Sequence, residues 1–493
     1  MTFNFWLSFS DSVKYAEAAI NFNYGRGLVI HHSLFNPVLL SKYTPGDAFS
    51  PGFHPLTSWV LSIVFRIFPL SDSTVVIFGV GVWLLIAVLV YLIGKKLHSI
   101  QAGITAVVFL LGNMYFLDYA RNSTSEIFLS LEIILAVILY LYNPKRKWLS
   151  LVPVTLMFFT RAQSIVIAVS LFILVLIFSR RRLLVLAVAG IIILTGIPFS
   201  SRYPFVSPAF YFNSIYSTPS DNNGAYMRGA PSDRITTRKL AAKTVYNLYN
   251  FLKFPDRIVN PIILALFLYG VFALIKQREL RGFYIYTLIS GLLLIIAASL
   301  TLPIARYVHP VLPLIFICAA ISLVELAKNL RLKYLFAGLL IFIVSLPMIG
   351  YITLDSRYRR QQFNTNQPPA YKAIADVMAQ NIPRGKLTIT NLDAWAAWYH
   401  GLTTMWFPLA PEMIKPYPGK INNVEYIVIT NYLENDANFS LGDWKEVVYS
   451  PENIKNPYLM NNYRVLKIFV IPATENYDNQ EYRGTILIKL VGL

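Results

Sequence analysis

Charged residues are scarce in this chain of 493 residues, and their scarcity sets the class of protein. Asp, Glu, Lys and Arg together make up 14% of the sequence, against about 25% in a soluble globular domain. Hydrophobic residues make up 56%, and the mean hydropathy is +0.52. Many of them lie in uncharged runs of about 17 to 22 residues, the length that a helix needs to cross a bilayer. The composition excludes an ordinary soluble enzyme and predicts an α-helical polytopic membrane protein.

The chain also has few acidic residues and almost no cysteine. Cys318 is the only cysteine and lies in an apolar run, so no intrachain disulfide can form. The opening MTFNFWLSFSDS has no basic segment followed by an apolar one, so it is not a signal peptide. Lys and Arg number 43 against 25 Asp and Glu. Because many of the basic residues flank the apolar runs, the excess indicates membrane topology rather than nucleic-acid binding.

About ten membrane spans are predicted from the apolar runs. They cover residues 73–94, 100–117, 122–142, 148–160, 162–178, 183–199, 259–275, 283–302, 308–326 and 335–352. Five short connections hold fourteen basic residues, whereas the opposite short turns hold only Arg121, Arg161 and Arg306. The rich set is cytoplasmic by the positive-inside rule, which predicts that the three arginines lie on the extracytoplasmic side.

Three longer segments then fall on the outer side and define the predicted domains. They are a first outer loop with interfacial helices at 1–72, a loop at 200–257 inside the membrane domain 73–354, and a small α/β domain at 355–493. In the last domain, a helix is predicted at 369–380 and strands at 387–390, 426–430, 446–449 and 465–471. The loop 200–257 is rich in Arg and Lys. Two interpretations fit it: a solvated loop drawn to anionic lipid, or a mobile lid over a binding pocket.

The first outer loop contains the segment DSVKYAEAAINFNYGRG, residues 11–27. Asp11 is suited to cap a short amphipathic helix that ends at Gly25 and Gly27. Spacing alone fits an interfacial helix with an ordinary cap. The same order, with Tyr15 four residues after the acid and a Gly-x-Gly at the end, resembles the first outer loop of GT-C glycosyltransferases. The similarity is strongest to the branch with protein O-mannosyltransferases and the lipid A aminoarabinose transferase.

Four further segments extend this resemblance in the order found in the family, over most of residues 11–320. They are FHPLTSW at 53–59, YARNSTSE at 119–126, FFTR at 158–161 and RYVHPVLP at 306–313. Ala162 stands where the family has a proline after the third segment. The resemblance implies an enzyme that, on the extracytoplasmic side, moves a sugar from a polyprenyl-phosphate donor to a hydroxyl group of a lipid, glycan or protein, with inversion at the sugar.

The resemblance also implies roles for charged residues on the outer side. Asp11 is the candidate general base or base-orienting group, and Asp118 and Glu126 are candidates to share that work. Arg306 and Arg161 are candidate ligands of the donor phosphate, because a guanidinium matches phosphate in a bidentate way. The simpler interpretation, in which these charges are helix ends and interfacial side chains, also fits.

A second group completes the predicted pocket. Arg121 and Lys14 are further candidate phosphate-binding cations, and the predicted pocket residues are Tyr15, His54, Tyr307 and His309. Asp118, Glu126 and His54 are the candidate ligands if the enzyme uses a divalent metal. No Cys-x-x-Cys or His-x-x-x-His pattern is present, and members of the superfamily differ in metal use, so no cofactor is assigned.

Two features inside the predicted membrane domain stand apart. Glu132 lies about ten residues inside its span, where an acid is either functional or bonded to a neighbouring helix. The run 148–160 is only about 13 residues, or roughly 20 Å of helix, against a core of about 30 Å. Arg161 at its end is therefore predicted to lie below the membrane surface, in a cavity or beside a partner.

Two other functions fit the same topology. One is a polysaccharide polymerase or ligase that uses lipid-linked donors, and the other is a flippase or transporter of lipid-linked sugars. A transporter predicts inverted repeats or broken midplane helices, which the sequence does not show. One topological expectation remains. Ten spans place residues 1–72 outside with no means of translocation, so we expect a preceding span of which residues 2–9 are the remnant.

Overall fold

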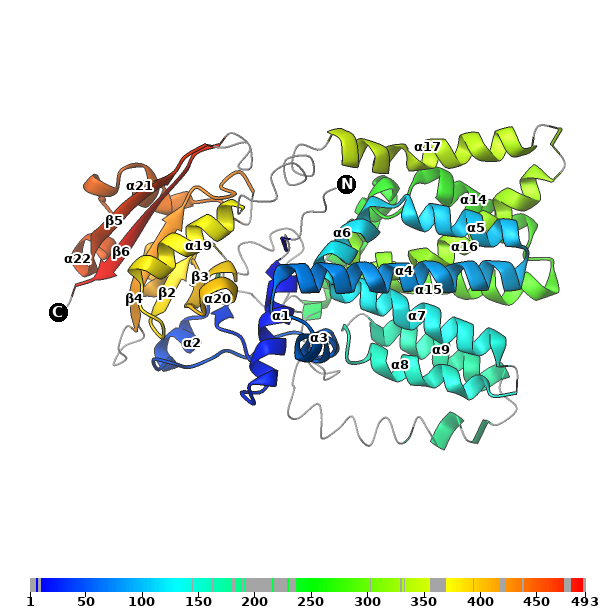
Figure 1. Cartoon of the computed structure of the whole chain (residues 1–493), viewed down its shortest axis with the longest axis horizontal. Helices are drawn as coiled ribbons and strands as arrows, with labels where there is room; N and C mark the ends of the chain where they lie inside the picture. The colour runs from blue at the N-terminus through cyan, green and yellow to red at the C-terminus, as the bar shows by residue number, and fades with distance from the viewer. Residues whose placement is uncertain are drawn as a thin grey trace.

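The structure is a computed structural model, and two bodies of secondary structure are joined by the N-terminal segment (Figure 1). It describes residues 6–7, 10–143, 145–161, 164–178, 182–183, 185–187, 190, 215–216, 228–229, 236–301, 303–328, 330–331, 333–354, 369–392, 394–416, 423–436, 439–473 and 480–490. Most of the predicted span 183–199, most of the outer loop before residue 236, and nearly all of the expected remnant 2–9 lie outside the described residues.

A bundle of apolar helices forms the larger body. Its helices are α4 (Asp72–Leu97), α5 (Ile100–Leu111), α6 (Met114–Asn122), α7 (Ser125–Tyr142), α8 (Leu151–Met157), α9 (Ser164–Phe178), α14 (Pro261–Ala273), α15 (Arg278–Leu300), α16 (Leu312–Ala327) and α17 (Lys333–Leu354). α13 (Thr237–Lys253) packs beside α15. Four described stretches are long and apolar enough to cross a membrane: Asp72–Leu97, Ser125–Tyr142, Arg278–Leu300 and His309–Ala327. This confirms a helical membrane protein, while the count of ten spans stays a prediction.

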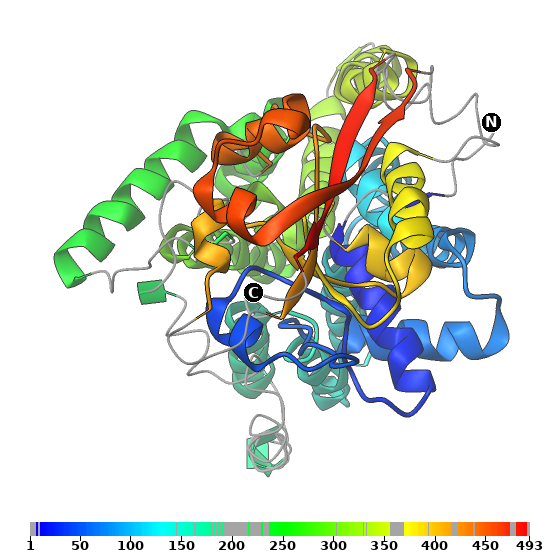
Figure 2. The same cartoon turned by 90° about the vertical axis from the view of Figure 1, so that its left-hand side faces the viewer.

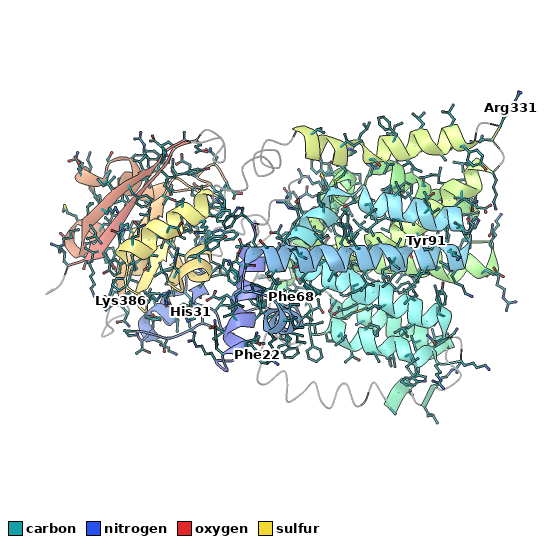
Figure 3. All side chains as sticks on the ribbon, viewed as in Figure 1. Phe22, His31, Phe68, Tyr91, Arg331 and Lys386 are labelled. Carbon is teal, nitrogen blue, oxygen red and sulfur yellow. The ribbon has the colours of Figure 1, made fainter. Side chains whose placement is uncertain are left out.

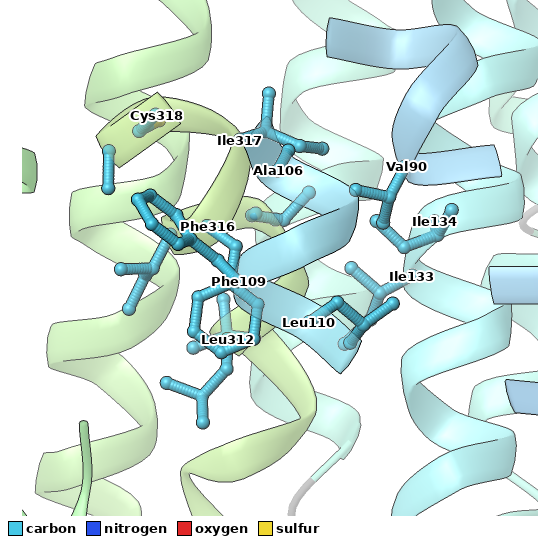
Figure 4. Close-up of a cluster of buried hydrophobic side chains, with 14 of the residues drawn as sticks. Val90, Ala106, Phe109, Leu110, Ile133, Ile134, Leu312, Phe316, Ile317 and Cys318 are labelled. Atoms are coloured by element: carbon cyan, nitrogen blue, oxygen red, sulfur yellow. The ribbon is translucent and has the colours of Figure 1, made fainter. Parts of the chain in front are cut away.

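Large aliphatic and aromatic side chains fill the middle of the bundle (Figure 4). Phe109 and Leu110 of α5 contribute to it together with Ile133 of α7 and Phe316 of α16, and all four are at most 1% exposed. Of α16, nearly every side chain is buried, which makes it the central helix of the bundle. The apolar residues of α16 face all directions around the helix. The sequence therefore predicts a membrane helix here, but it does not predict that this helix lies at the centre of the bundle.

The predicted span 100–117 is wrong in one respect, because the chain bends within it. α5 and α6 meet at an angle of 67° across a short break. The break falls at Gly112 and Asn113, and the Asn113 Oδ1 accepts the Phe116 backbone N–H at 3.3 Å, which caps the new helix. α6 therefore has a direction of its own, and the turn after it carries part of the candidate site.

A six-stranded sheet forms the second body. Its strands are β1 (His32–Ser33), β2 (Leu387–Thr390), β3 (Thr403–Trp406), β4 (Val424–Thr430), β5 (Tyr463–Ile471) and β6 (Tyr482–Lys489). They lie in the order β1-β3-β2-β4-β6-β5, parallel as far as β4 and antiparallel beyond it. α19 (Ala370–Asn381) and α20 (Trp395–His400) cover one face, while α21 (Lys445–Tyr449) and α22 (Pro457–Asn462) cover the other (Figure 2). The sheet confirms the expected C-terminal α/β region.

Most of the predicted elements in this region are confirmed. The helix at 369–380 and the strands at 387–390, 426–430 and 465–471 are present with ends shifted by a few residues. The strand predicted at 446–449 is wrong, because these residues belong to α21. Val447 and Val448 are both buried against the same face of the sheet, which a helix permits and an alternating strand does not.

The first strand comes from the other end of the chain. β1 pairs with β3, and the His32 Nδ1 lies 3.0 Å from the Thr404 Oγ1 across 372 positions of sequence. The sheet therefore includes residues from both the predicted first outer loop and the predicted C-terminal domain.

Hydrogen bonds at the start of α4 connect the helix bundle to the sheet domain. The Asp72 carboxylate accepts hydrogen bonds from the Trp398 Nε1 at 2.7 Å and the Tyr399 hydroxyl at 2.8 Å, both on α20. The Leu7 backbone N–H donates to the same carboxylate at 3.2 Å, and the Leu7 carbonyl accepts from the Tyr371 hydroxyl at 2.6 Å. The sheet domain is thus held directly on the end of a membrane helix.

Candidate active site

α1 (Ser10–Asn23) lies between the two bodies and carries Asp11 in its first turn (Figure 1). A carboxylate is stabilised there by the partial positive charge of the helix N-terminus. Ala16 and Ala19 are fully buried, and the helix is followed by Gly25 and Gly27 at φ +74° and +80°. The helix and its glycine-containing end are therefore as the sequence predicted, but Asp11 lies within the first turn rather than at the cap, and the helix is buried on more than one face.

A tight turn between α6 and α7 positions Glu126. Ser123 adopts a left-handed conformation at φ 44°, which is strained for a residue with a Cβ. Its hydroxyl donates to the Val75 carbonyl at 2.6 Å, and α4 can approach because Gly79 has no side chain: a Cβ there would lie 2.0 Å from the Ala120 carbonyl oxygen. Glu126 follows in the first turn of α7 and is almost fully buried.

Arg161 and Arg306 come from two further segments. Arg161 follows α8, and this turn is held by a 2.9 Å hydrogen bond from the Leu56 backbone N–H to the Phe159 carbonyl. Arg306 lies in the 3₁₀ turn Ala305–Tyr307, ahead of α16. Two segments predicted from the resemblance, 53–59 and 158–161, are therefore in contact.

Four charged side chains from these segments form a continuous chain of ion pairs. The Arg306 Nη1 lies 3.0 Å from the Asp11 Oδ2, and the Arg306 Nε lies 3.6 Å from the Glu126 Oε1. The Arg161 Nη1 forms a direct ion pair with the same Glu126 oxygen. Asp11 and Arg306 are 38% and 33% exposed, whereas Glu126 is only 3% exposed. The series of ion pairs is thus buried in the protein at Glu126, whereas Asp11 and Arg306 are accessible to a ligand.

Aromatic and hydroxyl groups hold these charges in place. The Tyr15 hydroxyl and the Arg161 Nη1 both donate to the Ser125 Oγ at 3.1 Å. The Tyr307 ring lies 4.9 Å from the Arg161 guanidinium carbon and 5.8 Å from that of Arg306, within the range of cation–π attraction. The resemblance predicted Tyr15 and Tyr307 as pocket residues, and the structure places both against the arginines.

Burial and neighbouring charges set the protonation of the groups outside the spans. Burial opposes the charge on Arg306, but Asp11 and Glu126 outweigh it and hold the pKa of Arg306 well above its usual value. Burial, with the Arg161 charge in addition, lowers the pKa of His54 to about 3. Burial, followed by the negative charge of Asp11, raises the pKa of Tyr15. The site therefore combines permanent cations with an uncharged imidazole and an uncharged phenol.

Four other predicted site residues lie in different surroundings. His309 is buried, with its Nδ1 2.5 Å from the Tyr119 hydroxyl and its Nε2 3.0 Å from the Arg257 carbonyl, so both ring nitrogens are occupied. Arg121 is buried on α6. The remaining two, Lys14 on α1 and Asp118 on α6, are half-buried.

Metal binding receives no support from the geometry of the described residues. Within the part of the chain that the structure describes, His, Cys, Asp and Glu form no group of three or more that could hold a metal ion. Asp118, Glu126 and His54, the candidate ligands, do not form such a group. Glu126 is instead enclosed by two guanidinium groups.

Two supporting residues were not assigned a role by sequence reasoning. Ser125 links Tyr15 to Arg161, and its only sequence signal is its place just before Glu126 in the family-like segment. Thr160 donates to the Glu132 Oε1 at 2.6 Å, directly before Arg161 in the chain. Of the two interpretations of Glu132, the structure bears out the bond to a neighbouring helical segment.

Comparison with known proteins identifies the fold. ArnT from Cupriavidus metallidurans in the apo state has a TM-score of 0.52 at 14% identity, over 98% of this chain and 94% of that one. The same protein bound to undecaprenyl phosphate has a TM-score of 0.52 at 13% identity, over 99% and 95%. The archaeal oligosaccharyltransferase AglB from Archaeoglobus fulgidus, in complex with an inhibitory peptide and a dolichol-phosphate, has a TM-score of 0.50 at 13% identity, over 92% and 75%. The chain has the fold of the GT-C superfamily of membrane glycosyltransferases.

A family model narrows the likeness further. Residues 50–201 match the model of the dolichyl-phosphate-mannose-protein mannosyltransferases, about a third of the chain. No curated protein sequence matches. The resemblance seen in the sequence motifs is therefore confirmed, and the family match supports a membrane glycosyltransferase as the class of this protein.

Proposed function

We propose that this chain is a glycosyltransferase that moves a sugar from a polyprenyl-phosphate donor to a hydroxyl group of an acceptor. The observation that carries the proposal is the chain of ion pairs from Asp11 through Arg306 and Glu126 to Arg161. Four segments far apart in sequence bring these charges together, at the junction of the helix bundle and the outer domain. Asp11 and Arg306, which are partly exposed, form the accessible end of this series of ion pairs.

The two arginines are suited to the donor phosphate. The leaving lipid phosphate gains negative charge in the transition state, and fixed guanidinium groups stabilise it without reorganising. Glu126 holds both guanidinium groups in position, and its burial between them makes it an anchor rather than a proton acceptor. Removing one preorganised donor of this kind costs about 10²–10³ in rate.

Asp11 is suited to the acceptor. In the proposed step the acceptor oxygen forms a bond to C1 of the sugar, and its proton passes to the Asp11 carboxylate. The bond between C1 and the phosphate oxygen breaks, and the lipid phosphate leaves with the electron pair. Attack opposite the leaving group inverts the configuration at C1. When the phosphate occupies Arg306, Asp11 loses its partner and becomes available to the acceptor hydroxyl.

The proposed setting follows the charge pattern of the loops. The arginine-bearing turns lie at the end of the bundle that carries the outer domain, opposite the basic connections. By the positive-inside rule the site and the sheet domain are extracytoplasmic. The proposed acceptor is a lipid, a glycan or a protein of the cell envelope, and the plasma membrane of a prokaryote is the expected location.

Mass spectrometry of cell-envelope glycoconjugates tests the proposal, and it does not require the sugar to be identified in advance. Cells that lack this protein are complemented with the wild type, with Asp11→Asn or with Asp443→Asn. Asp443 is an exposed acid of the outer domain and serves as the matched control. We expect one sugar-bearing conjugate to return with the wild type and the control but to stay at least 100-fold lower with Asp11→Asn, because a general base contributes about 10²–10⁴ in rate.

Protein amounts in the membrane are measured in parallel, so that loss of the conjugate is not confused with loss of the enzyme. Full restoration by Asp11→Asn would refute the assigned role of Asp11. Identical glycoconjugates in cells with and without the protein would refute glycosyl transfer itself.

A further inference from the structure

A cavity of about 470 Å³ lies at the end of the bundle that is remote from the candidate active site. Its walls come from the loop after α4, from α5, from the last turns of α16 and from the start of α17. α4 joins the two ends of the bundle and has 26 residues, or roughly 39 Å at 1.5 Å per residue. The cavity is therefore a separate site. Figure 3 shows this end of the molecule at Arg331, opposite Lys386 and His31.

One end of the cavity is polar and basic. Glu325 pairs with both the His98 Nε2 and the Lys328 Nζ, and the His98 Nδ1 lies 3.0 Å from the Ser99 Oγ. Lys328 is 55% exposed, and its ammonium group has three N–H donors, of which the pair with Glu325 uses one. The ammonium group is thus held at the cavity by Glu325 while it keeps donors for an anion.

The rest of the wall is apolar and opens outward. Leu323, Val324 and Ala327 of α16 line it, and Ile104 of α5 lines it while remaining 53% exposed on the outside of the bundle. In a bilayer, an exposed isoleucine on a membrane helix faces the lipid chains. A soluble anion would leave this wall against water or lipid, whereas a phospholipid fills both the polar end and the apolar wall.

The surrounding charge selects the sign of the headgroup. Lys95 and Lys96 end α4 and are exposed, and Arg331 follows Lys328 in the connection to α17. Glu325, the acid that contacts His98 and Lys328 of the cavity wall, is already paired with these two cations. Basic pockets between membrane helices on the positive side attract anionic headgroups.

We infer that this cavity binds an anionic phospholipid of the leaflet opposite the outer domain, with its phosphate at Lys328 and an acyl chain along Ile104. The site is independent of the proposed glycosyl transfer, because none of its lining residues belongs to the ion-pair chain. Bound lipid bridges α5, α16 and α17, the three helices whose residues line the cavity.

Native mass spectrometry of the purified full-length chain tests the inference. The protein is exposed to equal amounts of phosphatidylglycerol and phosphatidylcholine with the same acyl chains, and the retained lipid is counted. We expect phosphatidylglycerol to be preferred. Lys328→Gln should lower that preference about five-fold, the change that corresponds to about 1 kcal/mol. Ile104→Trp leaves the charge unchanged but crowds the apolar mouth, so it should lower retention of both lipids.

Lys145→Gln is the matched control, because Lys145 is an exposed lysine in the connection after α7, at the same end, and does not line the cavity. It should change the preference less than two-fold. Equal retention of the two lipids by the wild type, or an equal effect of Lys145→Gln and Lys328→Gln, would overturn the site. Displacement of phosphatidylglycerol by excess soluble glycerol 3-phosphate would also overturn it, because it would indicate a free phosphate ligand.

Discussion

Replacing Glu126 with glutamine isolates the anchor of the ion-pair chain. The substitution keeps the size and one acceptor oxygen of the side chain but removes the charge that faces two guanidinium groups. Arg306 retains Asp11 at 3.0 Å, so the loss falls mainly on Arg161. Arg161 is only 11% exposed and would keep only the Ser125 hydroxyl and the Tyr307 ring among these contacts.

The magnitude follows from the cost of leaving a buried charge unpaired. Breaking one side of a buried ion pair costs about 3–5 kcal/mol, and the retained contacts of Arg161 favour the lower end, about 3 kcal/mol. An unfolding entropy of about 2.1 cal per mol per K for each residue then predicts a melting temperature lowered by roughly 3 °C if the chain unfolds as one unit. The double variant Glu126→Gln/Arg161→Gln removes both charges and should recover most of this loss.

The single cysteine provides the assay. Cys318 is fully buried in α16, so a thiol-reactive fluorophore added in detergent labels the chain only as the bundle opens. Glu425→Gln is the matched control, because Glu425 also pairs with a cation, Lys386, but on the exposed surface. Its melting temperature should stay within about 1 °C, since exposed ion pairs contribute about 0–1 kcal/mol. A Glu126→Gln melting temperature equal to that of the wild type, or a double variant as unstable as the single one, would refute the reasoning.

Two further predictions concern protonation and backbone conformation. Burial and the Arg161 charge lower the pKa of His54 to about 3. The neutral His54 ring therefore makes its full contribution to the free energy of unfolding above about pH 6.5, and this contribution is lost as the pH falls toward 3. His54→Gln should flatten the melting temperature between pH 6 and 4, and an unchanged profile would contradict this. Gly229→Ala should destabilise by about 1–3 kcal/mol more than Gly25→Ala in the same melting assay. Both glycines have positive φ, but a Cβ at Gly229 would lie 2.6 Å from the Phe35 Cδ1, whereas a Cβ at Gly25 would have no atom within 4 Å. Equal losses of stability in the two variants would show that the clash with Phe35 does not contribute.

The class of the fold was predictable because the signals are local and strong. Apolar runs, basic connections and the Asp11 segment each act within a few tens of residues, and the structure contains the corresponding helices. The bend between α5 and α6 was missed because Gly112 and Asn113 are a weak interruption of an otherwise apolar run. The strand predicted at 446–449 failed because two adjacent valines fit either a strand or a buried helix face.

The sequence indicated which residues belong to the candidate site better than it indicated which of them pair with one another. Family order indicated Asp11, Glu126, Arg161 and Arg306, but not that one carboxylate would hold both arginines. That arrangement depends on how α7 meets the turns after α8 and α15, which is a matter of three-dimensional packing. Ser125 illustrates the limit: a small hydroxyl residue carries almost no sequence signal, although two site residues bond to it.

The origin of β1 has a consequence for how the chain is made. His32 is synthesised 372 positions before Thr404, its neighbour in the sheet. At about 5–20 residues per second, the ribosome needs roughly 20 to 70 s to supply the second strand after the first. During that interval the segment around β1 has already left the ribosome but has no β3 to pair with.

The same segment carries α1, which packs against α20 of the late-made domain as well as against α3 (Leu56–Ile67). Asp11 therefore reaches its final surroundings only when the last quarter of the chain has emerged and folded. A protein truncated after α17 would retain all four members of the ion-pair chain in its sequence, yet the helix that bears Asp11 would lack one of its two walls. The packing around Asp11 is therefore complete only after the sheet domain has been made.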